Sequence, residues 1–194
     1  MTGTRSRTAA RSSNVGARPR LDRAFFDRPA GRVARDLLGA RLEVRARGAA
    51  RTARIVETEA YVRGDAASHA VRGPTRRNRS MFGPPGTLYV FRIHQVVCAN
   101  LVARRAEAVL LRAGTISRTA PGVASGPGRL CRALGLTIAD DGEDAVTGRR
   151  VRVFADVERP ARVRVGRRVG IRRAAERRLR FWVADEPAVS RPRG

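Results

Sequence analysis

The stretch Arg54-Ile55-Val56-Glu57-Thr58-Glu59-Ala60-Tyr61 decides how the rest of this sequence is interpreted. Along a β-strand, successive side chains point to opposite faces. One face of this strand would carry Ile55, Glu57, Glu59 and Tyr61, and the other would carry Val56, Thr58 and Ala60. A face with two acids and an aromatic ring is unsuited to a core. It suits the wall of a pocket that holds a flat molecule and performs acid–base chemistry on it.

The segments around this stretch predict a sheet with short helices. Asp27 and Pro29 predict the start of a helix that ends at Gly39, and Ser125-Gly126-Pro127-Gly128 leads into a second helix that ends at Gly135. We predict an α+β fold: a single compact domain with a curved, mostly antiparallel β-sheet and a few short helices. The strand patterns lie at 41–46, 52–61, 87–93, 96–102, 108–112, 149–157, 162–171 and 179–184.

The two ends of the chain differ from its middle in composition. Residues 1–20 are rich in Arg, Ser, Thr and Gly and have no hydrophobic periodicity, so we expect a disordered basic N-terminal arm. Residues 187–194 are interpreted as a basic C-terminal tail. The folded domain is therefore predicted to span residues 21–186.

The charge of the chain points to a polyanionic partner. Among 194 residues, 41 are basic and 17 acidic, which gives a formal net charge of +24, and every basic residue is Arg. Nucleic acid is the leading candidate for this partner, ahead of an anionic membrane surface. The cluster Arg76, Arg77 and Arg79 is either a solvated loop or a set of phosphate contacts, and we favour phosphate contacts. Gly126 and Arg129, at a glycine-rich helix entry, are further candidates for contacts with the DNA backbone.

Cysteine and histidine usage gives no sign of a metal site. Cys98 and Cys131 lie far apart and form no zinc motif with the two histidines, so we expect two buried thiols in a reducing compartment. No apolar run approaches the roughly 20 residues that span a bilayer. The N-terminus has no apolar region typical of a secretory signal. We therefore expect a cytoplasmic, nucleoid-associated protein with no membrane partner.

Several blocks in order resemble the alkyladenine (3-methyladenine) DNA glycosylases of the alkylpurine type. They are 54–61, His69, Arg77-Asn78-Arg79-Ser80-Met81-Phe82, Pro85-Gly86-Thr87-Leu88-Tyr89-Val90, 109–113 and 125–134. The resemblance covers most of the chain, from about Phe25 to Val183. It implies a single mixed α/β domain that needs no metal or cofactor. The family excises damaged purines: 3-methyladenine and 7-methylguanine, and in some members hypoxanthine and ethenoadenine. The resemblance therefore implies that the partner is double-stranded DNA that contains damaged purines.

The resemblance also implies roles for individual residues. Glu59 matches the carboxylate that activates water, and Arg112 matches an arginine at the water site. Tyr61 and His69 match residues that stack on the flipped base, and Phe91 falls where an aromatic ring covers its other face. Asn100 matches an asparagine that crowds the 2-amino group of guanine.

The sequence departs from this family between Phe91 and Asn100. Members commonly carry a Tyr-Gly pair here, on a hairpin tip, and the Tyr fills the gap left by the flipped nucleotide. In this chain the tip reads Ile93-His94-Gln95. We expect His94 to be the DNA-intercalating wedge, because its ring is planar and falls where the family has Tyr, and because strand alternation would turn Ile93 toward the core. The alternative is that His94 contacts a phosphate and Ile93 is the wedge.

Two further expectations concern the activity itself. Without lysine, the chain has no side-chain amine for a Schiff base, so a glycosylase of this sequence should be monofunctional. We also expect a monomer. The rival interpretations are a non-catalytic basic nucleic-acid-binding protein and a metal-dependent nuclease that uses Glu57, Glu59 and Asp65 as ligands. For Glu57 we favour an ion pair with a nearby arginine.

Overall fold

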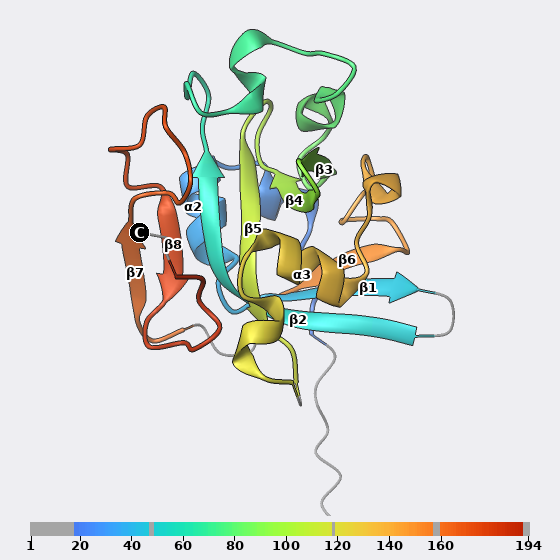
Figure 1. Ribbon diagram of the computed structural model, residues 1–194. Helices are drawn as coiled ribbons and strands as arrows, with labels where there is room; N and C mark the ends of the chain where they lie inside the picture. Colours follow the sequence, from blue (N-terminus) through green and yellow to red (C-terminus); the bar gives the residue numbers. More distant parts are fainter. Residues whose placement is uncertain (1–17, 47–48, 118, 157–159, 192–194) are drawn as a thin grey trace, which may run out of the picture.

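The computed structural model describes residues 18–46, 49–117, 119–156 and 160–191 (Figure 1). Its helices are α1 (Arg23–Phe26), α2 (Ala30–Asp36) and α3 (Pro127–Leu134), and its 3-10 turns are η1 (His69–Arg72), η2 (Arg79–Phe82), η3 (Pro121–Ala124) and η4 (Ile138–Asp140). Its strands are β1 (Arg41–Ala46), β2 (Ala49–Tyr61), β3 (Leu88–Ile93), β4 (Val96–Val102), β5 (Ala108–Thr115), β6 (Val151–Phe154), β7 (Val163–Gly166) and β8 (Arg180–Val183).

The long strand β2 is the axis of the sheet. Its first half pairs with β1, and its second half pairs with β5 on one side and with β8 on the other. The strand order is β3-β4-β5-β2-β1-β6, with β7 joined through β8, and every pairing is antiparallel. Figure 1 shows β2 curving upward from its pairing with β1 to lie beside β5. The predicted α+β fold with a curved antiparallel sheet is confirmed.

The strict alternation predicted along β2 is interrupted at Glu57. The register with β5 shifts between Ile55 and Glu57 and again between Glu57 and Thr58. Such bulges bend a strand and redirect its side chains, and they are frequent beside active sites. Here the irregularity lies immediately before Glu59, at the point where β2 leaves β1.

The two predicted helices are present, but the first differs from the prediction at both ends. α2 ends at Asp36, and a turn over residues 37–39 replaces the predicted helical end at Gly39. α3 ends at Gly135, which adopts the left-handed conformation with φ of 73°. α2 begins after Pro29 rather than after Asp27, because Asp27 closes the preceding short helix α1. The backbone N–H of Ala30 donates to the carboxylate of Glu107 at 2.8 Å, so α2 is capped from a distant part of the chain.

The strand predicted at 162–171 is much shorter in the structure. β7 ends at Gly166, and the chain then leaves the sheet and makes a long loop before β8. Gly170 adopts a φ of +74°, a conformation that glycine takes without strain. This β7–β8 loop, residues 167–179, crosses to the carboxylates of β2, as described below.

Packing extends beyond both predicted domain boundaries. Residues 1–17 of the predicted arm lie outside the described residues, but Arg20 forms a bridge with Phe154 and donates to the carbonyl of Ala145 at 3.0 Å. At the other end, Ala188 and Ser190 are buried in the folded domain. These first residues of the predicted tail therefore pack against β2.

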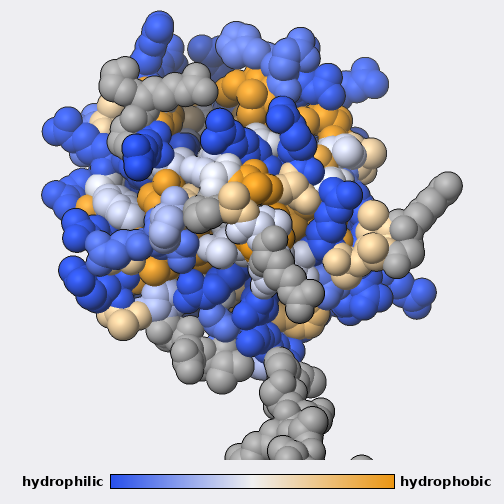
Figure 2. All heavy atoms as spheres, turned by 60° about the horizontal axis from the view of Figure 1, so that its bottom comes forward, coloured by the Kyte–Doolittle hydropathy of each residue, from blue (hydrophilic) through white to orange (hydrophobic). Residues whose placement is uncertain are grey.

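Polar side chains dominate the face of the molecule drawn in Figure 2. Figure 2 shows a face on which hydrophilic side chains surround small apolar patches, as expected for a chain with 30% charged residues. Cys98 and Cys131 are free and buried, as predicted, and burial raises the pKa of Cys98 to about 11 and that of Cys131 to about 12. Within the described residues, no helix combines the length and apolar character needed to cross a membrane.

Candidate active site

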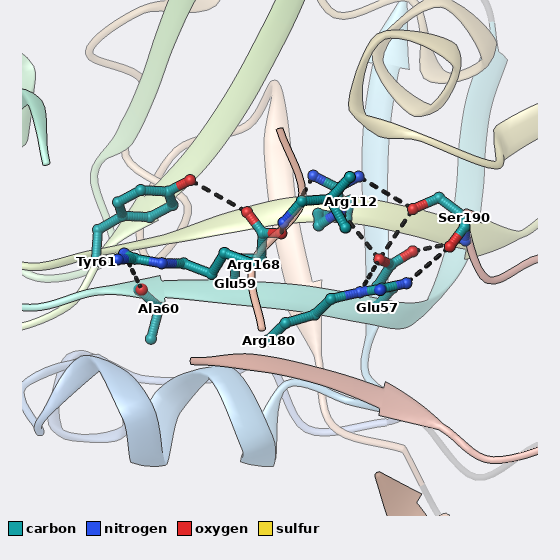
Figure 3. A network of polar contacts seen from close by, with 9 residues as sticks. Glu57, Glu59, Ala60, Tyr61, Arg112, Arg168, Arg180 and Ser190 are labelled. Carbon is teal, nitrogen blue, oxygen red and sulfur yellow. Dashed lines mark hydrogen bonds and ion pairs between the residues drawn. The ribbon is translucent and has the colours of Figure 1, made fainter. Parts of the chain in front are cut away.

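Glu59 lies at the centre of a buried polar network on β2 (Figure 3). Its carboxylate lies 3.3 Å from a guanidinium nitrogen of Arg112 and accepts hydrogen bonds from the Val169 backbone N–H at 2.7 Å and the Tyr61 hydroxyl at 3.1 Å. Burial raises the pKa of Glu59, and the positive charge of Arg112 only partly offsets this effect. The pairing of Glu59 with Arg112 brings together the two residues predicted to be catalytic.

Glu57 is held by more partners than Glu59. It accepts hydrogen bonds from Nε of Arg112 at 3.0 Å, from Nε of Arg180 at 2.7 Å, and from both the backbone N–H and the hydroxyl of Ser190 at 2.7 and 2.9 Å (Figure 3). The predicted ion pair of Glu57 is confirmed. Because Arg112 contacts both carboxylates, Glu57 fixes the arginine that faces Glu59.

Next to Tyr61 lies a cavity of about 140 Å³, which we call the base cavity. The hydroxyl of Tyr89 lies 2.8 Å from Nδ1 of His69, and the ring centroids of His69 and Phe91 are 4.5 Å apart. Burial lowers the pKa of His69, so its imidazole is neutral at pH 7. All four residues predicted to bind a base line this cavity: Tyr61, His69, Phe91 and Asn100.

The segment that carries His69 is fixed by Asn78. The Asn78 side chain is buried, and it donates to the carbonyls of His69 at 2.8 Å and Gly73 at 3.1 Å. Its own carbonyl oxygen accepts from the backbone N–H of Thr75 at 2.6 Å. Asn78 therefore holds one wall of the base cavity without lining it.

A larger groove of about 910 Å³ adjoins the base cavity and shares His69, Tyr89, Phe91 and Ile93 with it. Arg76 and Arg77 line this groove, as does Arg173 of the β7–β8 loop. The other predicted backbone contacts lie elsewhere. Arg79 is exposed on η2, Gly126 precedes α3, and Arg129 lies in the first turn of α3. None of these three residues lines the groove or the base cavity.

The hairpin tip between β3 and β4 corrects one expectation. Ile93 pairs with Val96, and the two-residue turn His94-Gln95 closes the hairpin with a φ of 49° at His94. Ile93 does not face the core, because 51% of its surface is exposed, and it lines both the groove and the base cavity. His94 is also exposed and lines the groove. Both wedge candidates are accessible, so strand alternation no longer counts against Ile93.

The three acids of the nuclease interpretation are each engaged by arginine. Asp65 is fully buried and forms a bidentate ion pair with Arg168, while Glu57 and Glu59 share Arg112. Within the described ranges, no group of three or more His, Cys, Asp or Glu is arranged to hold a metal ion.

Sequence reasoning missed several residues of this site. Tyr89 could have been found, since it lies two positions before Phe91 and alternation places both rings on one face. Arg168, Arg180 and Ser190 gave no such signal, because the two arginines occur in an arginine-rich region and Ser190 near the chain end. Only the fold shows that they are buried.

Comparison with known proteins shows the family to which this chain belongs. The family model described as methylpurine-DNA glycosylase (MPG) matches residues 24–187. Three relatives carry the name "Putative 3-methyladenine DNA glycosylase". The one from Rhizobium etli is 41% identical over 88% of this chain and 88% of its own. The one from Mycolicibacterium fortuitum is 43% identical over 81% and 91%, and the one from Methanoculleus marisnigri is 41% identical over 88% and 98%. The chain therefore belongs to the methylpurine-DNA glycosylase family.

Proposed function

We propose that this protein removes alkylated purines, such as 3-methyladenine and 7-methylguanine, from double-stranded DNA by hydrolysing the N-glycosidic bond. The observation that carries the proposal is the buried carboxylate of Glu59, which accepts a hydrogen bond from Tyr61. Tyr61 in turn lines a cavity that is walled by aromatic rings and adjoined by an arginine-lined groove. Family membership supports the same reaction.

A base inside a duplex must be rotated out before a pocket can receive it, at a cost of a few kcal/mol. In this proposal, Tyr61 stacks on one face of the flipped base, and His69 and Phe91 cover the other. Stacking on aromatic rings offsets about 1–3 kcal/mol per base. A neutral His69 suits a cationic methylated purine because it adds no like charge, while ring faces attract a cation. Asn100 crowds the 2-amino group of an undamaged guanine and so disfavours its binding.

Bond cleavage places positive charge on the sugar. Glu59 stabilises that charge and, with Arg112, orients the attacking water. A methylated purine leaves as a neutral base, so this step needs no proton donor. Hypoxanthine and ethenoadenine leave less readily from their neutral forms, and we propose them only as slower substrates.

We propose a monofunctional, monomeric enzyme that acts on DNA without a cofactor. The chain has no lysine, so no side-chain amine can form a Schiff base with the sugar. The product is therefore an intact abasic site and a free base.

The proposal is tested by measuring release of free base from duplexes that carry each lesion, with EDTA present. The wild-type chain should release methylated purines and leave a strand that is cut only after alkali treatment. Glu59→Gln should slow release by about 100- to 10,000-fold, because an amide neither accepts a proton nor stabilises a cation. Its binding to lesion DNA should be retained.

Two results would contradict the proposal. Binding without release from any lesion by the wild type would favour a non-catalytic DNA-binding protein. Loss of all activity in EDTA would favour a metal-dependent nuclease.

A further inference from the structure

We propose that Arg168 is a positioning residue. It fixes three parts of the site relative to one another: the stacking wall formed by Tyr61, the carboxylate of Glu59, and the segment that leads to His69. The inference rests on the excision reaction proposed above and assigns a role to a residue that does not itself line the base cavity. Arg168 lies in the β7–β8 loop, and its side chain is fully buried.

The first contact is with the stacking wall. The Arg168 guanidinium lies over the Tyr61 ring, 4.6 Å from its centroid, and donates to the carbonyl of Ala60 at 3.1 Å. Tyr61 lines the base cavity, whereas Arg168 does not, so Arg168 supports the ring from outside the cavity. Figure 3 shows the Arg168 side chain directed toward Tyr61 and Ala60 on β2.

The second contact passes through the backbone. Val169 follows Arg168 directly, and its N–H donates to Glu59 at 2.7 Å. The Tyr61 hydroxyl donates to the other oxygen of Glu59 at 3.1 Å. A shift of Arg168 would therefore displace both hydrogen-bond donors of Glu59. The Val169 N–H would move because it is bonded to Arg168, and the Tyr61 hydroxyl would move because Arg168 supports the Tyr61 ring.

The third contact is with the segment that leads to His69. Two guanidinium nitrogens of Arg168 pair with the two oxygens of the Asp65 carboxylate, one of them at 3.0 Å. Asp65 accepts from the Ala67 backbone N–H at 3.0 Å, and its carbonyl accepts from the Ser68 N–H at 2.8 Å. Ser68 is the residue before η1, which begins at His69. Arg168 thus links both stacking walls and the carboxylate.

A buried ion pair is an inefficient way to stabilise a fold, since well-packed apolar residues of similar volume often stabilise at least as well. Its value here lies in the geometry that it fixes. Only a planar guanidinium can pair with both oxygens of Asp65, donate to Ala60 and stack on Tyr61 at once, and a lysine keeps the charge but not this arrangement.

The test compares Arg168→Lys with Arg162→Lys, a matched control. Arg162 lies just before β7, 71% of its side chain is exposed, and it pairs only with the exposed Asp185 in the described structure. Arg168→Lys should slow single-turnover release of 7-methylguanine by about 10- to 100-fold, because small misplacements of reacting groups are costly. Lesion-DNA affinity, which arises mainly at phosphates, should change by less than about threefold. Arg162→Lys should match the wild type.

The pH profile separates positioning from general loss of structure. The groups facing Glu59 are Arg112 of β5, Tyr61 and Glu57 of β2, the Val169 N–H of the loop, and Cys98 of β4. The Val169 hydrogen bond favours the ionised carboxylate, so its loss raises the pKa of Glu59 further. The acid limb of the rate profile should therefore move to higher pH in Arg168→Lys. A smaller folded fraction alone would lower the plateau without moving this limb.

A spectroscopic signal gives a second readout that does not depend on activity. The chain has only two tyrosines, Tyr61 and Tyr89, so fluorotyrosine labelling gives two ¹⁹F resonances, which Tyr61→Phe assigns. Arg168→Lys should shift the Tyr61 resonance and leave that of Tyr89 nearly unchanged. Asp65→Asn retains the arginine but weakens its anchor, so it should produce a smaller change in the same direction, and it decides the question if Arg168→Lys does not fold.

Three outcomes overturn the inference: wild-type rate in a folded Arg168→Lys variant, slower release with an unmoved acid limb, or an unmoved Tyr61 resonance. If Arg168→Lys does not fold, an Asp65→Asn variant that matches the wild type in rate, acid limb and Tyr61 resonance also overturns it. If the wild type releases no base from any lesion, the proposed function fails instead, and the Tyr61 resonance still tests the contact.

Discussion

At the scale of single residues, Glu57 and Glu59 are both fully buried on β2 but have different surroundings. Glu57 is paired with Arg112 and Arg180 and is hydrogen-bonded to Ser190, so its charge is well compensated. Glu59 contacts one arginine at 3.3 Å, and burial raises its pKa. The first carboxylate therefore organises the fold, while the second is kept poorly compensated where the proposed chemistry requires a charge.

This difference predicts opposite effects on stability. Glu57→Ala should lower the free energy of unfolding by about 3–5 kcal/mol, because it removes the carboxylate that pairs with buried Arg180 and one of the two that contact Arg112. Glu59→Gln should change stability little or raise it, as is common where function requires a strained site. Urea unfolding at neutral pH measures both. The exposed pair partner Asp185 serves as the control, since Asp185→Ala should cost no more than about 1 kcal/mol. Equal losses for Glu57→Ala and Asp185→Ala would show that Glu57 has no such structural role.

At the scale of elements, the β3–β4 hairpin tip carries the wedge in our proposal. Ile93 is apolar, half-exposed and next to the base cavity, whereas His94 occupies the strained turn position with φ of 49°. Wedges that enter a base stack are usually apolar. We therefore expect Ile93 to contribute more than His94, the opposite of the order that the sequence suggested.

The wedge is tested by comparing Ile93→Ala and His94→Ala on duplex and single-stranded substrates. Ile93→Ala should weaken binding to a lesion duplex and slow excision there by about tenfold, since an unfilled gap no longer offsets unstacking of the neighbouring bases. Excision from a single strand, in which nothing needs to be held open, should change little. A larger effect of His94→Ala on the duplex would restore His94 as the wedge. Equal effects on both substrates would exclude the tip from this role.

At the scale of the whole molecule, the net charge of +24 should appear as salt dependence. Each phosphate contact releases close to one counterion, so about six contacts would weaken DNA binding by about a thousandfold between roughly 50 and 200 mM salt. Replacing Arg76, Arg77 and Arg79 together by Gln should reduce the salt slope by about three. The control is Arg162→Gln with Arg164→Gln, since both of these arginines form ion pairs with Asp185. A flat salt response of the wild type would mean that its charge is only compositional.

The sequence by itself determined the sheet, most of its strands and the central part of the site. Alternation and glycine-bounded segments are local signals, so they placed β2, β3, β4 and β5 and put Glu59 beside Tyr61. The family motifs then pointed to Tyr61, His69, Phe91 and Asn100, which line the base cavity together with residues that the motifs did not assign. Local signals cannot report contacts with distant parts of the chain. The strand predicted at 162–171 was therefore too long, because β7 ends at Gly166 and the chain then crosses to β2.

Only the tertiary structure decided which arginines are buried and what they hold. All 41 basic residues are arginines, so composition cannot distinguish Arg168 from its exposed neighbours in the β7–β8 loop. The burial of Arg168 follows from contacts with Asp65 and Tyr61, more than 100 positions away in the chain. Ser190 likewise reaches Glu57 because the chain end returns to β2. Long-range pairing of buried charges depends on how distant segments meet, and no local pattern encodes that.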